Sequence, residues 1–246
     1  MRLKNKTAIV TGGASGFGAG IARKFVAEGA RVAIVDVNGD AAQSLAHELG
    51  GVAITADVSR DADVRALTTK AKAALGRIDI LVNNAGIGHK PQALEDLDEA
   101  EFDRLFAINA KSVYLTARHV VPLMKASGGG VILNIASTGG VSPRPRLTWY
   151  NATKGWMITA TRAMAIELAP HKIRVNAINP VAGETPLLKT FMGEDTPEIR
   201  AKFLATIPLG RFSTPDDIAG AACFLCSDEA SLVTGVALEV DGGRCI

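Results

Sequence analysis

Tyr150 and Lys154 stand four residues apart in the segment Tyr150-Asn-Ala-Thr-Lys154. On an α-helix this spacing brings both side chains to one face. A free tyrosine has a pKa of about 10 and is a poor base near neutrality, but a neighbouring cation favours the phenolate. Tyr150 could then take the proton of an alcohol as a hydride leaves, or return a proton during carbonyl reduction. The spacing is common by chance, so a surface Tyr–Lys pair is the alternative.

A glycine-rich turn, Thr11-Gly-Gly-Ala-Ser-Gly-Phe-Gly18, follows a β-branched run and opens a helical pattern. Glycine at positions 12, 16 and 18 permits a tight turn and lets a pyrophosphate approach the backbone. The following helix N-terminus presents free N–H groups and a partial positive charge to that pyrophosphate. The spacing is GxxxGxG rather than GxGxxG, and the alternative is an ordinary strand-to-helix turn. With a strand before it and a helix after it, we expect a dinucleotide site containing Gly12, Ser15, Gly16, Phe17 and Gly18.

An acidic residue, Asp36, ends the next strand pattern and is followed by Val37. A carboxylate there can accept hydrogen bonds from the adenosine ribose, and it would repel a 2′-phosphate. No arginine stands at position 15 or 37 to neutralise such a phosphate. The sequence therefore predicts NAD rather than NADP, with Asp36 and Val37 at the ribose.

Short β-branched runs alternate with longer helical patterns along the whole chain. We expect strands at 7–11, 31–36, 52–56, 79–83, 131–136, 173–179 and 237–240. We expect helices at 18–28, 41–49, 63–74, 99–124, 150–168 and 216–225. A repeated βαβ rhythm predicts an α/β fold in which helices cover both faces of a parallel sheet. The prediction is one doubly wound Rossmann domain, residues 1–246, with seven strands in the order 3-2-1-4-5-6-7. Residues 181–208 interrupt the rhythm as an insertion with a weakly helical stretch, which we interpret as a substrate lid.

Composition narrows the class of protein. The 246 residues are 48% hydrophobic and carry a net charge of +2, with no basic tract, which argues against a nucleic-acid partner. The sequence contains no run of 18 apolar residues that would predict a membrane span, and no apolar leader precedes the first strand. We therefore expect a cytoplasmic protein. Cys223 and Cys226 form a CxxC, but they fall in an apolar helical pattern without a second pair or a nearby histidine. We expect buried structural cysteines and no metal site.

These motifs together resemble the short-chain dehydrogenase/reductase family, in its single-domain branch. The resemblance runs from about residue 3 to residue 243. It rests on the glycine-rich turn, Asp57-Val58, Asn83-Asn-Ala-Gly86, Asn109, Ser137, the Tyr150–Lys154 segment, Arg174-Val-Asn-Ala-Ile-Asn-Pro180 and Asp241-Gly-Gly243. One position departs from the pattern, because Val181 follows Pro180 where the family commonly has glycine. We expect local reshaping there and no loss of binding.

The resemblance implies a catalytic set of Asn109, Ser137, Tyr150 and Lys154. Ser137 would hold the substrate oxygen, and Lys154 would lower the Tyr150 pKa and bind the nicotinamide ribose. Asn109 would hold a water through its carbonyl and extend a proton relay to Lys154. Asn83 would brace the sheet. The cofactor contacts that it implies beyond the turn are Asp57, Val58, Asn84, Ala85, Gly86, Tyr150, Lys154, Pro180, Val181, Gly183 and Thr185.

The expected substrate pocket follows Ser137 and includes residues 87–92 and the lid. Its apolar members would be Val141, Trp149, Leu187, Leu188, Phe191 and Met192. Arg144 and Arg146 could meet an acidic group of the substrate, face solvent or contact a neighbouring subunit. His89 is expected at the rim of the pocket.

The resemblance implies an NAD(H)-dependent oxidoreductase acting on a small secondary alcohol or ketone. An NADPH-dependent 3-oxoacyl reductase is the alternative, although Asp36 and the absence of an arginine at position 15 argue against it. A non-catalytic NAD sensor is a second alternative, but it would be expected to lose Tyr150 or Lys154. The family commonly forms tetramers through the helices at 99–124 and 150–168 and the last strand, so we expect a D₂ homotetramer.

Overall fold

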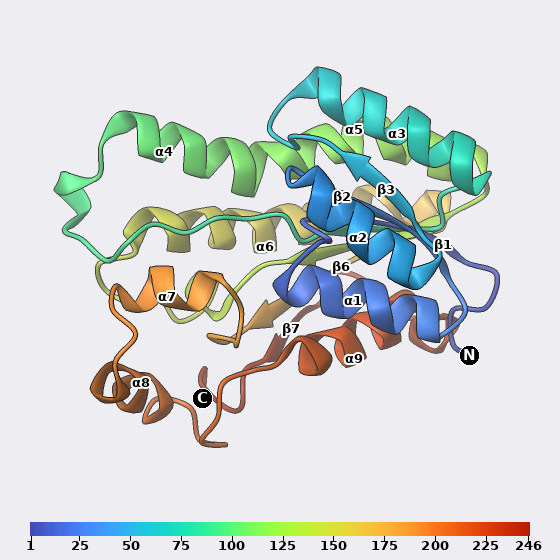
Figure 1. The fold of residues 1–246 in the computed structure, drawn as a ribbon. Coiled ribbons are helices and arrows are strands. Elements are labelled where there is room, and N and C mark those ends of the chain that lie inside the picture. The colour runs from blue at the N-terminus through green and yellow to red at the C-terminus, as the bar shows by residue number, and fades with distance from the viewer.

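The computed structural model describes residues 1–246 and contains one seven-stranded sheet (Figure 1). The strands are β1 (Thr7–Thr11), β2 (Arg31–Asp36), β3 (Val52–Thr55), β4 (Ile80–Asn83), β5 (Gly130–Ile135), β6 (Ile173–Pro180) and β7 (Ala237–Val240). All neighbouring pairs are parallel, and the order is β3-β2-β1-β4-β5-β6-β7. The predicted sheet and strand order are confirmed.

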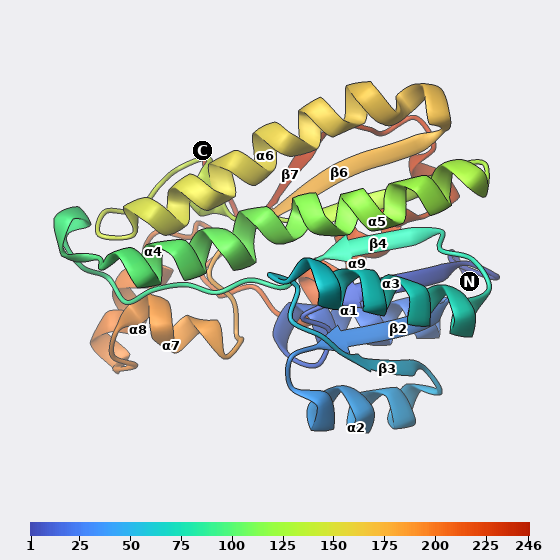
Figure 2. The ribbon, with the colours of Figure 1, turned by 90° about the horizontal axis from the view of Figure 1, so that it is seen from above.

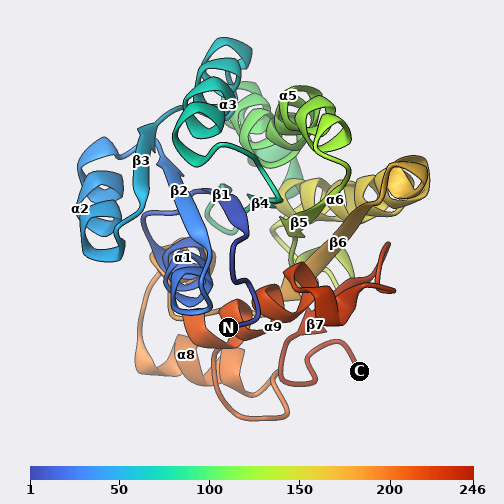
Figure 3. The same ribbon diagram turned by 90° about the vertical axis from the view of Figure 1, so that its right-hand side faces the viewer.

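Helices cover both faces of this sheet, which Figure 3 shows end-on. They are α1 (Gly16–Ala27), α2 (Gly39–Leu49), α3 (Asp61–Leu75), α4 (Glu99–Phe106), α5 (Ser112–Ala126), α6 (Thr148–Leu168), α7 (Leu187–Met192), α8 (Pro197–Leu204) and α9 (Pro215–Cys226). Helices α1, α2 and α9 pack on one face and α3, α5 and α6 on the other, with a separate apolar cluster in each layer. Central strands are buried on both sides, which explains their continuous apolar runs.

The predicted helix 99–124 is one rod in Figure 2, but its geometry is not uniform. Between α4 and α5 lies a π-helical turn, Ala107–Lys111 (η2), and α5 continues to Ala126. A π turn shifts backbone pairing from i→i−4 to i→i−5 and occurs often at functional sites. The apolar periodicity of the sequence does not reveal such a local widening. The consequence is that Asn109 lies inside the π turn, where it is buried.

Residues 181–208 form their own small structure at the end of the sheet farthest from the N-terminus (Figures 1 and 2). The segment contains the short helices α7 and α8. Its core is a small apolar cluster made by Val181, Leu188, Met192, Ile207 and Phe212. The segment therefore packs through its own side chains beside the carboxyl ends of the strands.

None of the helices combines the length and apolar character that crossing a bilayer requires.

Candidate active site

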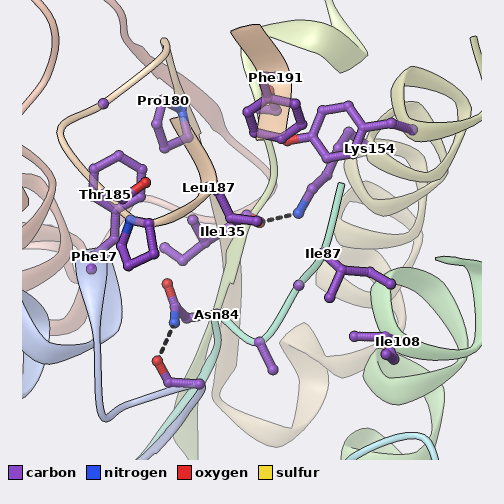
Figure 4. Close-up of a pocket in the computed structure, with 18 of the residues that line it drawn as sticks. Phe17, Asn84, Ile87, Ile108, Ile135, Lys154, Pro180, Thr185, Leu187 and Phe191 are labelled. Atoms are coloured by element: carbon purple, nitrogen blue, oxygen red, sulfur yellow. Dashed lines mark hydrogen bonds between the residues drawn. The ribbon is translucent and has the colours of Figure 1, made fainter. Parts of the chain in front are cut away.

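A cavity of about 540 Å³ lies at the carboxyl ends of the strands. In an open parallel sheet, this edge forms a crevice where the strand order reverses, here between β1 and β4. The cavity is lined by almost all of the predicted site residues: Gly12, Ser15, Gly16, Phe17, Asp36, Val37, Asp57, Val58, Asn84, Ala85, Gly86, Ser137, Tyr150, Lys154, Pro180, Val181, Gly183 and Thr185. Figure 4 shows part of this wall, with Phe17 and Thr185 on one side and Lys154 and Phe191 on the other.

The glycine-rich turn has a backbone that only glycine adopts without strain. Gly12 and Gly16 have φ of +57° and +50°. A Cβ on Gly12 would also lie 2.8 Å from the Cα of Ala85, so a side chain there would push β1 and β4 apart. The N–H groups of Gly16, Phe17 and Gly18, in the first turn of α1, have no acceptor within the protein. This cradle fits the pyrophosphate of a dinucleotide.

Gly18 has a different place from its predicted neighbours, because it does not line the cavity. A Cβ on Gly18 would lie 2.1 Å from the carbonyl oxygen of Gly12 and 2.5 Å from Nδ2 of Asn84. The residue therefore lets α1 pack closely against the turn. Gly18 thus has a packing role in addition to its predicted place in the pyrophosphate cradle.

Two polar side chains fasten the turn to the sheet. Asn84 Nδ2 donates to the carbonyl oxygens of Thr11 and Gly12 at 3.0 and 2.9 Å (Figure 4). Asp36 Oδ2 accepts from the N–H of Ala14 at 3.1 Å, and its Oδ1 accepts from the N–H of Asn38 at 3.0 Å. Asp36 thus stands beside the turn at the end of β2, with Val37 exposed next to it.

Asp57 and Val58 follow β3 and line the same end of the cavity. Asp57 Oδ1 accepts from the N–H and the hydroxyl of Ser59 at 2.9 and 2.7 Å, and the N–H of Asp57 donates to Asp63. These bonds fix the loop between β3 and α3. Together with Asp36, Asp57 makes this end of the cavity acidic.

Helix α6 carries the predicted Tyr–Lys pair at its N-terminal part. Tyr150 is 8% exposed and Lys154 is 5% exposed. The helical spacing places the Lys154 ammonium 5.9 Å from the centre of the Tyr150 ring, and Lys154 Nζ donates to the carbonyl oxygen of Ile135 at 2.9 Å (Figure 4). Ser137 follows β5, where its Oγ accepts from the N–H of Gly139 at 3.0 Å. All three side chains line the cavity.

The pKa values of this pair depart from the expectation. Burial raises the pKa of Tyr150 to about 12, and the neighbouring Ser137 hydroxyl offsets only part of that rise. Burial also lowers the pKa of Lys154, to about 8. In the protein without cofactor, burial therefore outweighs the expected lowering of the Tyr150 pKa by Lys154. Desolvation disfavours both charged forms, and at this separation it outweighs the attraction between them.

Asn109 does not line the cavity but bonds to Ile87, which does. It is fully buried, and its side chain exchanges two bonds with the backbone of Ile87: Oδ1 accepts from the N–H, and Nδ2 donates to the carbonyl, each at 2.9 Å. Nδ2 also donates to Thr153 Oγ1, on α6, at 3.1 Å. A Cβ on Gly86 would lie 3.3 Å from Asn109 Oδ1 and 3.5 Å from Lys154 Nζ. Asn109 therefore ties the loop after β4 to the catalytic helix.

The segment after β6 crosses over the glycine-rich turn. A Cβ on Gly16 would meet Thr185 at 3.3 Å, and one on Gly183 would meet the Phe17 ring at 2.4 Å. Val181, where the family commonly has glycine, is buried and its N–H donates to the carbonyl of Val240 at 3.4 Å. The valine side chain joins the apolar cluster of the segment, which accounts for the departure.

The expected substrate wall is only partly right. Ile87, Leu187, Leu188, Phe191 and Arg144 line the cavity, whereas Val141, Trp149, Met192 and Arg146 do not. Trp149 instead donates to the carbonyl of Leu94 and packs edge-on against Phe102. His89 is buried, not at the rim: it is 2% exposed, and its Nδ1 lies 2.9 Å from the carbonyl oxygen of Lys90.

Several lining residues were not named individually in the prediction, among them Arg104, Ile108, Asn151 and Phe203. Ile108 directly precedes Asn109, so its place could have been inferred from that motif. Phe203 lies on α8, within the predicted lid, but the weak helical pattern of this stretch does not single out this residue. Cys223 and Cys226 are buried in α9, and burial raises the pKa of both thiols, consistent with inert structural residues.

Comparison with known proteins agrees with this geometry. A family model described as enoyl-(acyl carrier protein) reductase matches residues 12–244. The 4-formylbenzenesulfonate dehydrogenase TsaC1/TsaC2 of Comamonas testosteroni is 51% identical over 252 residues, with all of both chains covered.

Two solved structures also match closely. A 3-ketoacyl-(acyl-carrier-protein) reductase from Brucella melitensis, complexed with NADH, is 53% identical with a TM-score of 0.95, and the match covers 99% of this chain and 100% of the other. A 7α-hydroxysteroid dehydrogenase complexed with NADH and 7-oxo glycochenodeoxycholic acid is 41% identical with a TM-score of 0.92, covering 98% and 95%. Sequence, fold and site agree that the chain belongs to the short-chain dehydrogenase/reductase family of oxidoreductases.

Proposed function

We propose that the protein is an NAD(H)-dependent oxidoreductase that interconverts an alcohol and its carbonyl compound, a secondary alcohol and its ketone or a primary alcohol and its aldehyde, with Tyr150 as the general acid and base. One observation carries the proposal: Ser137, Tyr150 and Lys154 lie on the wall of the same cavity as the glycine-rich turn. Two structural relatives were solved with NADH, which supports a nicotinamide cofactor.

The proposed roles follow from the positions of the side chains. Bound nicotinamide supplies the hydride donor or acceptor. Ser137 Oγ holds the substrate oxygen, and Tyr150 Oη takes the alcohol proton during oxidation or donates it during reduction. Lys154, anchored on the Ile135 carbonyl, presents its ammonium to the nicotinamide ribose and to the phenol. Asn109 fixes the position of the loop after β4 relative to helix α6. Its backbone carbonyl, in the π turn, is the proposed acceptor for a bound water.

Residues Pro180, Val181, Gly183 and Thr185 are proposed to hold the carboxamide of the nicotinamide. Their segment continues into α7 and α8, which we propose as the substrate lid, residues 181–208. The segment has a small apolar cluster of its own, which supports the proposal that it moves as a unit. Asp57, Val58 and residues 84–86 are proposed to surround the adenosine.

Cofactor choice is proposed to depend on Asp36. The carboxylate is already at the end of β2, where the 2′-phosphate of NADP would lie, and Val37 beside it is apolar. Like charges in contact at an effective dielectric near 20 repel by about 2–4 kcal/mol, which corresponds to roughly a 30- to 1000-fold preference for NAD.

This choice is tested by kcat/KM for NAD and NADP at one ionic strength. Asp36→Ala with Val37→Arg should shift the preference toward NADP, because one change removes repulsion and the other adds a guanidinium. Asp36 also accepts two backbone bonds, so Asp36→Asn is the control that keeps an acceptor without the charge. Equal use of both cofactors by the wild type would refute the role of Asp36.

The activity itself is tested by absorbance of NADH with a panel of secondary alcohols, ketones and aldehydes. Aldehydes are included because the relative of 51% identity is named for one. Turnover of any compound in the panel would support the proposed oxidoreductase activity. NADH binding with no turnover across the panel would favour a non-catalytic sensor.

A 3-oxoacyl reductase is the second candidate, because the structural relative of 53% identity is described as one. That relative was solved with NADH, so the candidate does not require NADPH. Reduction of acetoacetyl-CoA at a kcat/KM above that of the simple ketones would favour it.

A further inference from the structure

Arg144 occupies an unusual position in the substrate part of the cavity. It is half-buried and lines the wall, and its guanidinium lies 4.2 Å above the centre of the Phe203 ring. Its only side-chain hydrogen bond is to a neutral group, from Nη2 to Thr206 Oγ1 at 2.9 Å. No carboxylate lies within ion-pair distance. The charge of Arg144 is thus partly desolvated without a counter-ion.

A second guanidinium lies close by. Arg244, near the C-terminus, donates from Nη1 to Ser142 Oγ at 3.0 Å, and its Nε is buried with no partner. The two arginines are near enough for Arg244, together with burial, to lower the pKa of Arg144. A partly desolvated guanidinium without a counter-ion, in the field of a second cation, favours a ligand that brings negative charge.

Other charges near the site do not supply that anion. The acidic residues of the cavity wall, Asp36 and Asp57, are at the end of β2 and β3, away from Tyr150. Two acidic residues of the 181–208 segment, Glu184 and Asp195, are both paired with Arg200. The ring of Phe203 lies against the Arg144 guanidinium, and the cavity wall also contains neutral side chains such as Leu147 and Leu188.

We propose that Arg144 is the specificity-determining residue of the substrate site and binds a carboxylate or sulfonate at the end of the substrate away from the reacting carbon. The inference rests on the proposed function, because Tyr150 must mark where that carbon lies. The rings of Phe191, 4.7 Å from that of Tyr150, and of Phe203, under Arg144, make a wall suited to a flat apolar body. The substrate class is therefore an aromatic carbonyl compound, or its alcohol, that carries an anionic group.

The position of Arg144 is fixed relative to the catalytic helix. Asn151, the residue after Tyr150, donates from Nδ2 to the backbone carbonyl of Arg144 at 2.8 Å. This bond joins the loop that carries the cation to the start of α6. An anion on Arg144 and a carbonyl at Tyr150 would then be held by one rigid unit, which orients the substrate for reaction.

The test compares two substrates that differ in charge, 4-formylbenzoate and 4-methylbenzaldehyde, in the holoenzyme with NADH. Arg144→Gln should lower kcat/KM for 4-formylbenzoate by roughly 10- to 100-fold, the loss expected for a hydrogen bond to a charged group. It should leave 4-methylbenzaldehyde within about threefold, because the catalytic residues are untouched. Arg146→Gln, which makes the same charge change at an exposed neighbour outside the cavity, is the matched control.

A second readout needs no turnover. Binding of 4-sulfobenzoate to the enzyme–NADH complex, followed by calorimetry, should weaken about tenfold or more in Arg144→Gln and stay unchanged in Arg146→Gln. Equal effects on charged and neutral aldehydes, or unchanged 4-sulfobenzoate binding, would overturn the role of Arg144. Turnover of neutral aldehydes with no preference for the anionic one would overturn this inference and leave the proposed function standing. Failure to turn over any carbonyl compound, with 4-sulfobenzoate still bound through Arg144, would overturn the proposed function alone.

Discussion

Tyr150 and Lys154 are held where each side chain favours its neutral form. The phenol stays protonated well above neutral pH, with a pKa of about 12, so it is ready to donate a proton to a carbonyl oxygen. Alcohol oxidation instead needs the phenolate, which the positive charge of bound oxidised nicotinamide would favour. The buried pair therefore suits reduction as it stands and depends on the cofactor for oxidation.

Replacing Tyr150 with phenylalanine tests this role directly. Tyr150→Phe removes only a hydroxyl, so the thermal unfolding midpoint and the affinity for NADH should stay close to those of the wild type. Turnover should fall by at least about 100-fold, as is typical when a general acid is removed. Tyr114→Phe is the control, because Tyr114 is the other tyrosine of the chain and is 53% exposed on α5. Near-normal turnover of Tyr150→Phe would remove Tyr150 from the mechanism.

Lys154 makes stability depend on pH in a predictable window. Its pKa falls from 10.5 in the unfolded chain to about 8 in the folded protein, so below pH 8 the native state bears the full penalty of a buried ammonium. Between pH 8 and 10.5 the unfolded state binds more protons than the native state, and the stability contributed by this group rises with pH. The total rise is on the order of 3 kcal/mol.

The measurement is the free energy of unfolding in urea, from pH 7 to 10, for the cofactor-free wild type and for Lys154→Met. Subtracting one free energy of unfolding from the other cancels the contributions of the other titrating groups. The wild type should be less stable than Lys154→Met at pH 7, and this difference should shrink as pH rises. The range stops at pH 10 because the raised pKa of Tyr150 acts with the opposite sign between pH 10 and 12. A difference that does not change with pH would mean that burial does not lower the Lys154 pKa.

At the scale of the elements, most of the architecture was predictable because the signals were local and repeated. The buried strands are continuous apolar runs, and each is followed by a longer helical pattern, so the predicted bounds differ from the structure by only a few residues. The start of a helix was harder to predict where the side chain of the N-cap residue makes no hydrogen bond to the first turn, as at Ser15 before α1. The π turn was missed, since it changes backbone pairing without changing the apolar pattern.

The gathering of the expected cofactor residues around one cavity was predictable from the glycine-rich turn, from Asp36 and, for the others, from the family resemblance, and most of them follow strands whose carboxyl ends meet at one edge. The substrate part was not. Arg144 and Arg146 are two residues apart in one loop, yet Arg144 lines the cavity and Arg146 is exposed with φ of +65°. Phe203 reaches the cavity from α8, whose position depends on long-range packing. Loop conformation decides both cases, and neither spacing nor composition fixes it.

The packing of α1 on α9 gives a prediction for a pair of glycines. A Cβ on Gly20, in α1, would lie 2.6 Å from Cβ and 2.9 Å from the carbonyl oxygen of Pro215, at the start of α9. Gly20→Ala should therefore lower the free energy of unfolding by about 1–2 kcal/mol, since overpacking outweighs the better helix propensity of alanine. Gly220→Ala is the matched control in α9, where a Cβ meets nothing within 4 Å, and it should stabilise by up to about 1 kcal/mol.

Both variants are compared with the wild type by urea unfolding at one protein concentration, because association would make stability depend on concentration. Equal effects of the two substitutions would show that the α1–α9 contact can relax, and that helix propensity alone decides the outcome at both sites.

At the scale of the whole molecule, α6 has one face packed on the sheet and another facing outward. The outward face carries Ala152, Trp156, Thr159, Ala163 and Ile166, all exposed. Their alternating spacing of four and three residues places them in one stripe along the helix. Trp156 is 41% exposed and Ile166 is 80% exposed, so the stripe is largely apolar. A second copy of this chain could cover it by presenting the same stripe across a twofold axis.

We predict a D₂ homotetramer in solution, with a mass of about 103 kDa by light scattering, four times the 25.7 kDa of the chain. Ile166→Glu should lower that mass at micromolar concentration, because each copy would bury an unpaired carboxylate in the interface. Ser44→Glu adds the same charge to an exposed position on α2, outside the proposed interface, and should leave the mass unchanged. A D₂ tetramer has more than one kind of interface, so the first substitution should leave dimers held by the surfaces that it does not touch. A monomeric wild type would refute the assembly, and a full-size Ile166→Glu tetramer would place the contact elsewhere than on α6.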